Sequence, residues 1–343
     1  MGGNMSNLKK IFTSVLIAIG IASNSTTTLA EELSVATFIP PQHHINSFFF
    51  DWFGKEVADR SDGSLTIKVY PAGQLGAGPV QQYKRVVEGV ADIAFGLQTY
   101  TPALFPKSIL AVPPGKHTTS LESTRAIQNV FDEHFADEYN DVKLLGMFTV
   151  AGDAWAATKD LSTLDGINGS KIVPFAAMTS PIFEAWGAVP VQMPVTEMYT
   201  GLSTGTIDGT SISASQLTPP WNFGEVSSHY IDNIPVSFAV FFVAMNKERY
   251  IGLSDDHRAI IDGLAGKEVS MMGAQSFHND AVRGMNANAG DAPQVQNVEF
   301  VTISTDERKK MDALTAEALQ KIFADYAKNG VDNAEEIYNS LNK

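Results

Sequence analysis

The chain contains no cysteine among its 343 residues, so the fold relies on its core alone and gains nothing from disulfides. Basic residues are also scarce, since 24 Lys and Arg stand against 38 Asp and Glu, for a formal net charge of −14. A chain without a basic patch has little with which to neutralise phosphates, and nucleic-acid binding is therefore disfavoured.

Signatures of catalysis and metal binding are also missing. There is no H-E-x-x-H motif and no cysteine nucleophile, and we expect no serine nucleophile elbow. The pair His43-His44 invites a metal interpretation, but adjacent residues seldom ligate one ion, and no third His lies at ligand spacing. We predict no enzymatic activity, no metal and no other cofactor. An exported hydrolase is the alternative that activity screening would test.

Beyond the N-terminus, no stretch is long and apolar enough for a membrane span. Lys9 and Lys10 precede the apolar segment 11–21, and residues 28–30 read T-L-A, a small-x-small cleavage pattern. This order predicts a secretory signal peptide over residues 1–30. A retained N-terminal anchor is the alternative. We expect a periplasmic protein that does not span the membrane after cleavage of the signal.

What is present is an alternation of strand-like and helix-like segments. Strands are predicted over 33–39, 65–70 and 91–97, with helices over 45–60 and 80–88 between them. Such alternation predicts an α/β domain with a largely parallel sheet.

The second part of the chain continues the pattern. A helix is predicted over 120–140 and a strand over 142–150, and the apolar run 234–245 is interpreted as a strand buried on both faces that returns to the first sheet. Ser254 opens a helix that we expect to continue to about 289, and Thr305 opens a further long helix. The length allows two domains.

The most informative segment runs from Lys171 to Gly209. It reads K-I-V-P-F and then G-A-V-P-V-Q-M-P-V-T-E-M-Y-T-G-L-S-T-G-T-I-D-G. Earlier the chain reads P-A-G-Q-L-G and V-V-E-G-V-A-D-I-A-F-G, and later S-H-Y-I-D-N-I-P-V-S-F-A-V-F-F-V-A-M-N-K. In this order and spacing, the chain resembles the solute-binding proteins of TRAP (tripartite ATP-independent periplasmic) transporters over most of its mature length.

The resemblance implies an α/β, two-domain periplasmic binding protein fold with a hinge, connecting strands and a long domain-spanning helix. Domain I would comprise 31–150 and about 235–275, and domain II 151–234 and about 276–343. A small-molecule solute would bind in the cleft between them, and the receptor would deliver it to the TRAP membrane permease subunits. A ligand-sensing partner of a signalling receptor is the alternative.

The family usually reads K-I-R-V-P at this point, and its arginine clamps a substrate carboxylate with two parallel hydrogen bonds. Here Lys171 begins K-I-V-P, so Val173 stands at or beside the place of the arginine. The resemblance therefore predicts a ligand that is not a plain carboxylate. The alternative is a carboxylate receptor in which another cation replaces the arginine.

Two upstream residues bear on the ligand. Asp153 stands where some relatives place a basic residue, and a carboxylate suits a cation or a hydroxyl donor. Its alternatives are a solvated loop or a helix cap. Trp155 offers a face to a cationic or apolar ligand, although a Trp is more often used in core or hinge packing.

The remaining predicted ligand-binding residues stand at or near positions that the family uses, at the end of the third predicted strand, or beside the first strand-to-helix loop. Ile212 stands in place of a family asparagine and Val195 in place of an aromatic residue. The further candidates are Phe38, His44, Leu97, Gln98, Tyr100, Phe175, Ser211, Ser213 and Gln216. Together they predict a neutral, amine or amino-alcohol, or aromatic solute.

Overall fold

The computed structural model describes residues 30–288 and 294–343. The predicted signal peptide therefore lies outside the described residues, apart from its last position. Within the described part, no helix combines the length and the apolar character needed to cross a bilayer.

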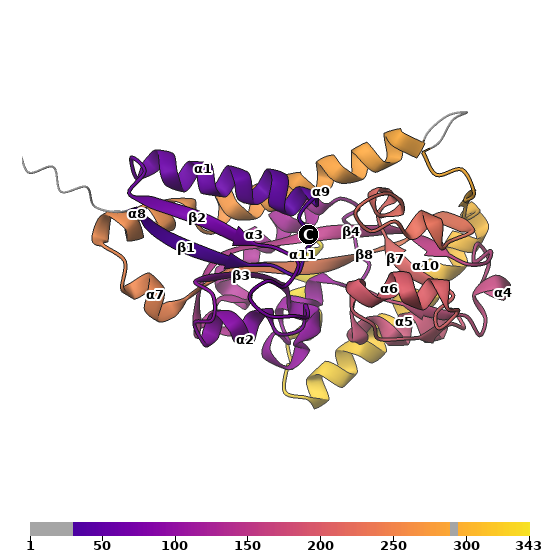
Figure 1. Ribbon diagram of the computed structural model, residues 1–343. Helices are drawn as coiled ribbons and strands as arrows, with labels where there is room; N and C mark the ends of the chain where they lie inside the picture. The colour runs from indigo at the N-terminus through magenta and orange to yellow at the C-terminus, as the bar shows by residue number, and fades with distance from the viewer. Residues whose placement is uncertain (1–29, 289–293) are drawn as a thin grey trace, which may run out of the picture.

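The described strands form one nine-stranded sheet in the order β2-β1-β3-β8-β4-β7-β5-β6, with β9 paired to β8 (Figure 1). The strands are β1 Glu31–Ala36, β2 Leu65–Tyr70, β3 Ile93–Leu97, β4 Val142–Ala157, β5 Lys171–Val173, β6 Val189–Pro190, β7 Gly209–Ile212, β8 His229–Asn246 and β9 Glu299–Thr302. We call β1–β3 the first end of the sheet and β5–β7 the second end.

The two ends are parallel, but the centre of the sheet is antiparallel. β1 pairs in parallel with β2 and β3, and β5 pairs in parallel with β6 and β7. The long strands β4 and β8 run antiparallel to one another, and β8 also runs antiparallel to β3. The expectation of a largely parallel sheet is therefore wrong at the centre, because apolar periodicity identifies a buried strand without giving its direction.

Helices cover the sheet on its faces and at its second end, where α4, α5 and α6 gather (Figure 1). The helices are α1 Asp51–Arg60, α2 Gln82–Val87, α3 Ser120–His134, α4 Leu164–Ile167, α5 Ser180–Ala185, α6 Val195–Ser203, α7 Lys247–Ile251, α8 Asp255–Leu264, α9 Lys267–Asn288, α10 Thr305–Lys328 and α11 Ala334–Leu341. The mixed α/β architecture agrees with the predicted fold class.

Helix α9 connects the two ends of the sheet. It packs on β4 and α3, and further along on the short turn η7 (Ala214–Leu217), which follows β7. The predicted helix from Ser254 is in fact two helices, because Gly266 adopts a left-handed φ of 79° between α8 and α9.

Candidate functional site

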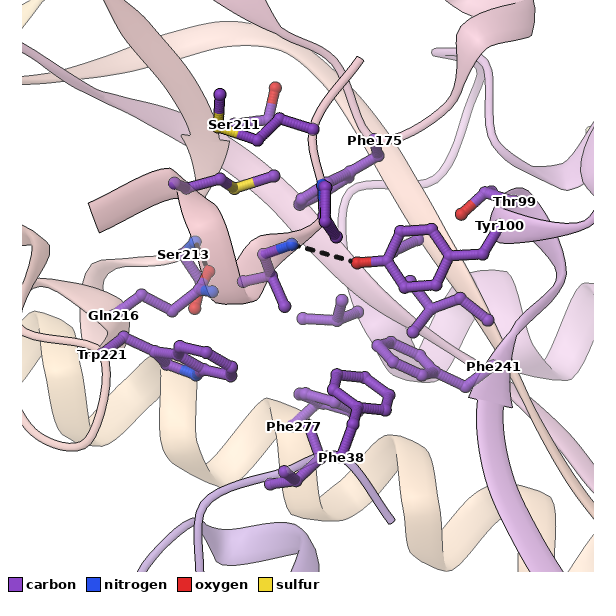
Figure 2. A pocket seen from close by; sticks show the side chains of 18 of the residues that line it. Phe38, Thr99, Tyr100, Phe175, Ser211, Ser213, Gln216, Trp221, Phe241 and Phe277 are labelled. Carbon is purple, nitrogen blue, oxygen red and sulfur yellow. Dashed lines mark hydrogen bonds between the residues drawn. The ribbon is translucent and has the colours of Figure 1, made fainter. Parts of the chain in front are cut away.

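A cavity of about 350 Å³ lies between the two ends of the sheet, and both ends contribute to its wall (Figure 2). This volume is in the range of small-molecule sites. The β1–β3 end supplies residues that directly follow β1 and β3, and the other end supplies residues that follow β5, β6 and β7. Side chains from β8 and α9 complete the lining.

Aromatic side chains form much of the wall. Two of them stack on each other, since the ring centroids of Phe241 on β8 and Phe277 on α9 are 5.1 Å apart at 24°. Tyr100 lies edge-on to Phe38 at 6.4 Å. The six aromatic residues of the wall are Phe38, Tyr100, Phe175, Trp221, Phe241 and Phe277. Such a surface suits a flat apolar ring.

The polar part of the lining is mostly uncharged. The Oε1 of Gln216 accepts a hydrogen bond from the backbone N–H of Ser213 at 2.9 Å, and the hydroxyls of Ser213 and Ser215 are 3.0 Å apart. Ser213 is the N-cap residue of η7, and Ser215 and Gln216 lie within that turn. Thr99, Gln192 and Ser211 also line the cavity. Neutral hydroxyl and amide groups can each meet either a donor or an acceptor of a ligand.

Among the described residues that line the cavity, one carries a carboxylate. Asp280 lines the cavity, and its Oδ1 accepts from Nη2 of Arg283 at 2.7 Å. The Oδ2 of Asp280 lies 3.4 Å from Nε2 of His44. No Lys or Arg is among the described residues that line the cavity. The carboxylate is thus already balanced by Arg283, and the wall offers little net charge to a ligand.

Both histidines of the first loop are neutral at physiological pH. Burial lowers the pKa of His44 from 6.5 to about 4, against the opposing attraction of Asp280. Burial likewise lowers the pKa of His43 well below its usual value, and neighbouring His44 and Arg283 add to the effect. Neither ring therefore replaces an arginine as a cationic anchor near neutral pH. Among the described residues, no group of three or more His, Asp or Glu is placed to hold a metal.

Ser276, His44 and Asp280 form a chain of contacts like that of a hydrolase triad. The Oγ of Ser276 is 2.6 Å from Nδ1 of His44. Ser276 is only 1% exposed and does not belong to the cavity wall, so a ligand in the cavity does not meet its hydroxyl. A nucleophile must reach the reacting atom, and this serine lies behind the wall.

The sequence contains the letters of a serine nucleophile elbow, contrary to our expectation, but the structure does not form one. Residues 201–205 read G-L-S-T-G and thus match the letters G-x-S-x-G. Ser203 is the last residue of α6, and its hydroxyl donates to the carbonyl of Thr200 at 3.0 Å. An elbow requires a sharp turn from a strand into a helix, which is not the position of Ser203.

Most of the predicted ligand-binding residues lie together in this cavity. They are Phe38, His44, Leu97, Tyr100, Phe175, Val195, Ser211, Ser213 and Gln216. Nearly all of them stand at or just beyond the end of a strand, or at the start of a helix, and Gln216 lies within η7. Their contact with a ligand remains a prediction.

The other predicted residues do not line the cavity. Gln98 is fully buried, and its amide donates to the hydroxyl of Tyr139 at 2.9 Å. Trp155 is also fully buried and packs against Trp186 with ring centroids 5.9 Å apart. Val173 and Ile212 are members of an apolar core cluster. All four side chains pack in the interior, although Oε1 of Gln98 and Nε1 of Trp155 have no hydrogen-bond partner among the described residues.

Asp153 lies in a bulge of β4, between Gly152 and Ala154, and does not face the cavity. Burial raises the pKa of its carboxyl to about 6, and the nearby carboxyl of Asp232 adds to the shift. Its Oδ1 has no hydrogen-bond partner within 30–288 and 294–343. The amine-binding interpretation rested on Asp153, and the geometry gives it no support.

The segment after β5 presents an aromatic ring to the cavity. Val173 is 1% exposed, and the next residues, Pro174 and Phe175, line the wall. The ring of Phe175 lies directly over Gly152, where an added Cβ would come within 2.2 Å of the ring. A side chain at position 152 would therefore displace Phe175.

Several lining residues were missed from the sequence. Phe241 belongs to the run that was interpreted as a strand buried on both faces. Phe277 and Asp280 belong to a helix in which apolar residues do not recur at a clear helical interval. Thr99 stands between two predicted residues and could have been included with them. Nothing in the sequence near Trp221 indicates that its indole reaches the cavity.

Residues 35–326 match the family described as bacterial extracellular solute-binding protein, family 7. The chain is 24% identical over 342 residues to the outer membrane transporter protein TsaT of Comamonas testosteroni, with 97% of each chain covered. Both similarities extend over nearly the whole described chain.

Solved structures show the same fold. A TRAP solute binding protein from Rhodoferax ferrireducens, in complex with copurified benzoate, has a TM-score of 0.83 at 24% identity, covering 91% of this chain and 96% of that one. A marine metagenome TRAP solute binding protein specific for aromatic acid ligands, in complex with 3-hydroxybenzoate, has a TM-score of 0.82 at 24% identity, covering 91% and 97%. Because the family match spans residues 35–326, this chain belongs to bacterial extracellular solute-binding protein family 7 and has the fold of the TRAP solute-binding proteins.

Proposed function

We propose that this protein is the periplasmic receptor of a TRAP transporter for an uncharged aromatic solute, which it passes to the membrane permease subunits. The observation that carries the ligand class is the composition of the cavity wall. Six aromatic residues line it, together with neutral hydroxyl and amide groups. The described part of the wall contains no Lys or Arg.

The aromatic character is supported by two structural relatives, which hold benzoate and 3-hydroxybenzoate. Those ligands carry a carboxylate, and a buried carboxylate is costly without a cationic partner. Since no such partner lines this cavity within the described residues, we infer that the ligand keeps the ring and replaces the carboxylate with a neutral oxygen or amide group.

A second candidate is an aromatic acid held by Arg283 as a substitute anchor. Arg283 pairs with Asp280, a residue of the wall, and its side chain is 53% exposed. The guanidinium would have to leave Asp280 and enter the cavity, which would expose that carboxylate unpaired.

Thermal shift and calorimetric titration at pH 7.5 with benzamide and benzoate test the proposal, because the two compounds differ chiefly in charge. We expect benzamide to stabilise the protein and benzoate to have little effect. Stronger stabilisation by benzoate or by simple dicarboxylates would contradict it. If benzoate binds and Arg283→Gln abolishes that binding, the second candidate is correct.

A further inference from the structure

Three hydroxyl groups on the cavity wall have hydrogen-bonding capacity that no described residue uses. The Oγ1 of Thr99 and the Oγ of Ser211 are buried and have no partner within the described part of the chain. The oxygen of Tyr100 accepts the backbone N–H of Val195 at 3.1 Å, but its own proton goes to none of the described residues. Buried polar groups are nearly always paired. The atoms of Thr99 and Ser211 have almost no accessible surface, whereas the ring of Tyr100 lines the cavity, so the unused Tyr100 proton indicates where a ligand or water completes the site.

Tyr100 joins the two ends of the sheet at the middle of the cavity. It belongs to the turn η2 (Gln98–Tyr100), which directly follows β3, whereas Val195 is the first residue of α6. Figure 2 shows the ring of Tyr100 extending into the pocket, with its hydroxyl directed at the Val195 nitrogen. Phe175 lies on one side of this bond and Phe241 on the other.

The Tyr100 hydroxyl is suited to donate. Burial raises its pKa to about 12, so it keeps its proton throughout the physiological range. Its oxygen also lies at the N-terminus of α6, where the positive end of the helix dipole polarises the O–H bond toward donation.

We propose that Tyr100 anchors the neutral oxygen of an aromatic ligand. Its O–H donates to a carbonyl or hydroxyl oxygen of the ligand, while its oxygen keeps the hydrogen bond from Val195 that holds the two ends of the sheet together. The aromatic ring of the ligand then packs among Phe175, Phe241 and Phe277. This inference rests on the proposed function and names the residue that takes over the anchoring role.

Two variants separate the donor role of Tyr100 from its bond to Val195, which joins the two ends of the sheet. Tyr100→Phe removes the hydroxyl and with it both hydrogen bonds. Val195→Pro removes the N–H and keeps the Tyr100 hydroxyl, and it also replaces an apolar side chain of the wall by the proline ring. Proline suits this position because it is the first of the helix and the preceding Pro194 already has φ −69° and ψ 149°. The ligands are acetophenone and α-methylstyrene, which have nearly the same shape and differ in a carbonyl oxygen against a CH₂ group.

The measured quantity is the ratio of the two dissociation constants, by calorimetric titration of the full mature chain. In wild type we expect acetophenone to bind more tightly. Tyr100→Phe should reduce this preference roughly three- to tenfold, the value of one neutral hydrogen bond. Val195→Pro should weaken both compounds and lower the preference by less than Tyr100→Phe does, because the donor hydroxyl remains and loses only the N–H that polarises it.

The outcomes distinguish the inference from the function on which it rests. If both compounds bind and Tyr100→Phe leaves their ratio unchanged, Tyr100 is not the anchor, whereas the proposed function stands. An equal loss of preference in Val195→Pro would assign the effect to closure of the cavity and overturn the donor role. If neither these compounds nor benzamide binds to wild type, the proposed function fails, and the inference fails with it.

Discussion

Two buried ionisable side chains have pKa values shifted in opposite directions across one pH range. The pKa of His44 falls from 6.5 to about 4, so the unfolded chain binds more protons there, and His44 makes the free energy of unfolding rise between pH 4 and 6.5. The pKa of Asp153 rises from 3.8 to about 6, so the folded chain binds more protons, and Asp153 makes that free energy fall between pH 3.8 and 6. The two contributions oppose each other.

Asp153→Asn separates the two contributions, because it removes the charge and keeps the shape. We expect it to increase the free energy of unfolding at pH 7.5 by about 1–3 kcal/mol, since a shift of one pKa unit corresponds to about 1.4 kcal/mol. At pH 4, where Asp153 is protonated in the folded state, the gain should vanish. Urea denaturation at both pH values measures this, with the exposed Asp141→Asn as the control. A loss of stability at pH 7.5 would mean that the Asp153 carboxylate has a stabilising partner.

At the scale of elements, helix α9 depends on glycine where it crosses its neighbours. A Cβ on Gly284 would lie 2.2 Å from the backbone nitrogen of Ser215, and a Cβ on Gly273 would lie 2.4 Å from the ring of Phe148. Ser215 belongs to η7 and lines the cavity, so the close approach at Gly284 sets the position of that wall.

We expect Gly284→Ala to destabilise the protein by about 1–3 kcal/mol, although alanine usually favours a helix over glycine by up to about 1 kcal/mol. The matched control is Gly263→Ala in α8, where the nearest atom, Nη1 of Arg60, is 3.8 Å from the added Cβ. This variant should be stabilising by about 0.5–1 kcal/mol. Urea denaturation of both measures the contrast. Two stabilising substitutions would mean that α9 and η7 do not touch in solution.

The sequence predicts elements best where short-range chemistry decides them. β2 has the predicted bounds, 65–70, because alternating residues lie between a turn and a proline. β4 extends to Ala157, well past its predicted end at 150, since it continues through a bulge in its pairing with β8 that residue periodicity does not reveal. The same contrast between short-range and long-range chemistry explains which residues of the site were predicted. Residues after strand ends were found, whereas those on β8 and α9 enter the cavity only through long-range packing.

At the scale of the whole molecule, the central ladder belongs to both ends of the sheet. β4 pairs with β8 from Val142 to Ala157, and β8 continues to β3 on one side while β4 continues to β7 on the other. The predicted division into two domains cuts across both strands. Most of the ladder pairs residues of the same predicted part, since 142–150 pair with 239–246 and 154–157 pair with 229–232. The two parts are instead tied by the unbroken strands themselves and by α9, which packs on β4 and α3 and also on η7, so unfolding of one part would remove contacts that α9 makes with it.

We therefore expect a single cooperative thermal transition, with equal calorimetric and van't Hoff enthalpies. Two core variants test this from opposite ends: Leu33→Ala on β1 and Ile172→Ala on β5, both fully buried in wild type. Each should cost about 2–5 kcal/mol and shift the whole transition to lower temperature. Two separable transitions, with each variant lowering only one of them, would show that the halves unfold independently. The shared strands would then act as a linker between domains, and closure of the cavity around a ligand would not be coupled to the stability of the sheet.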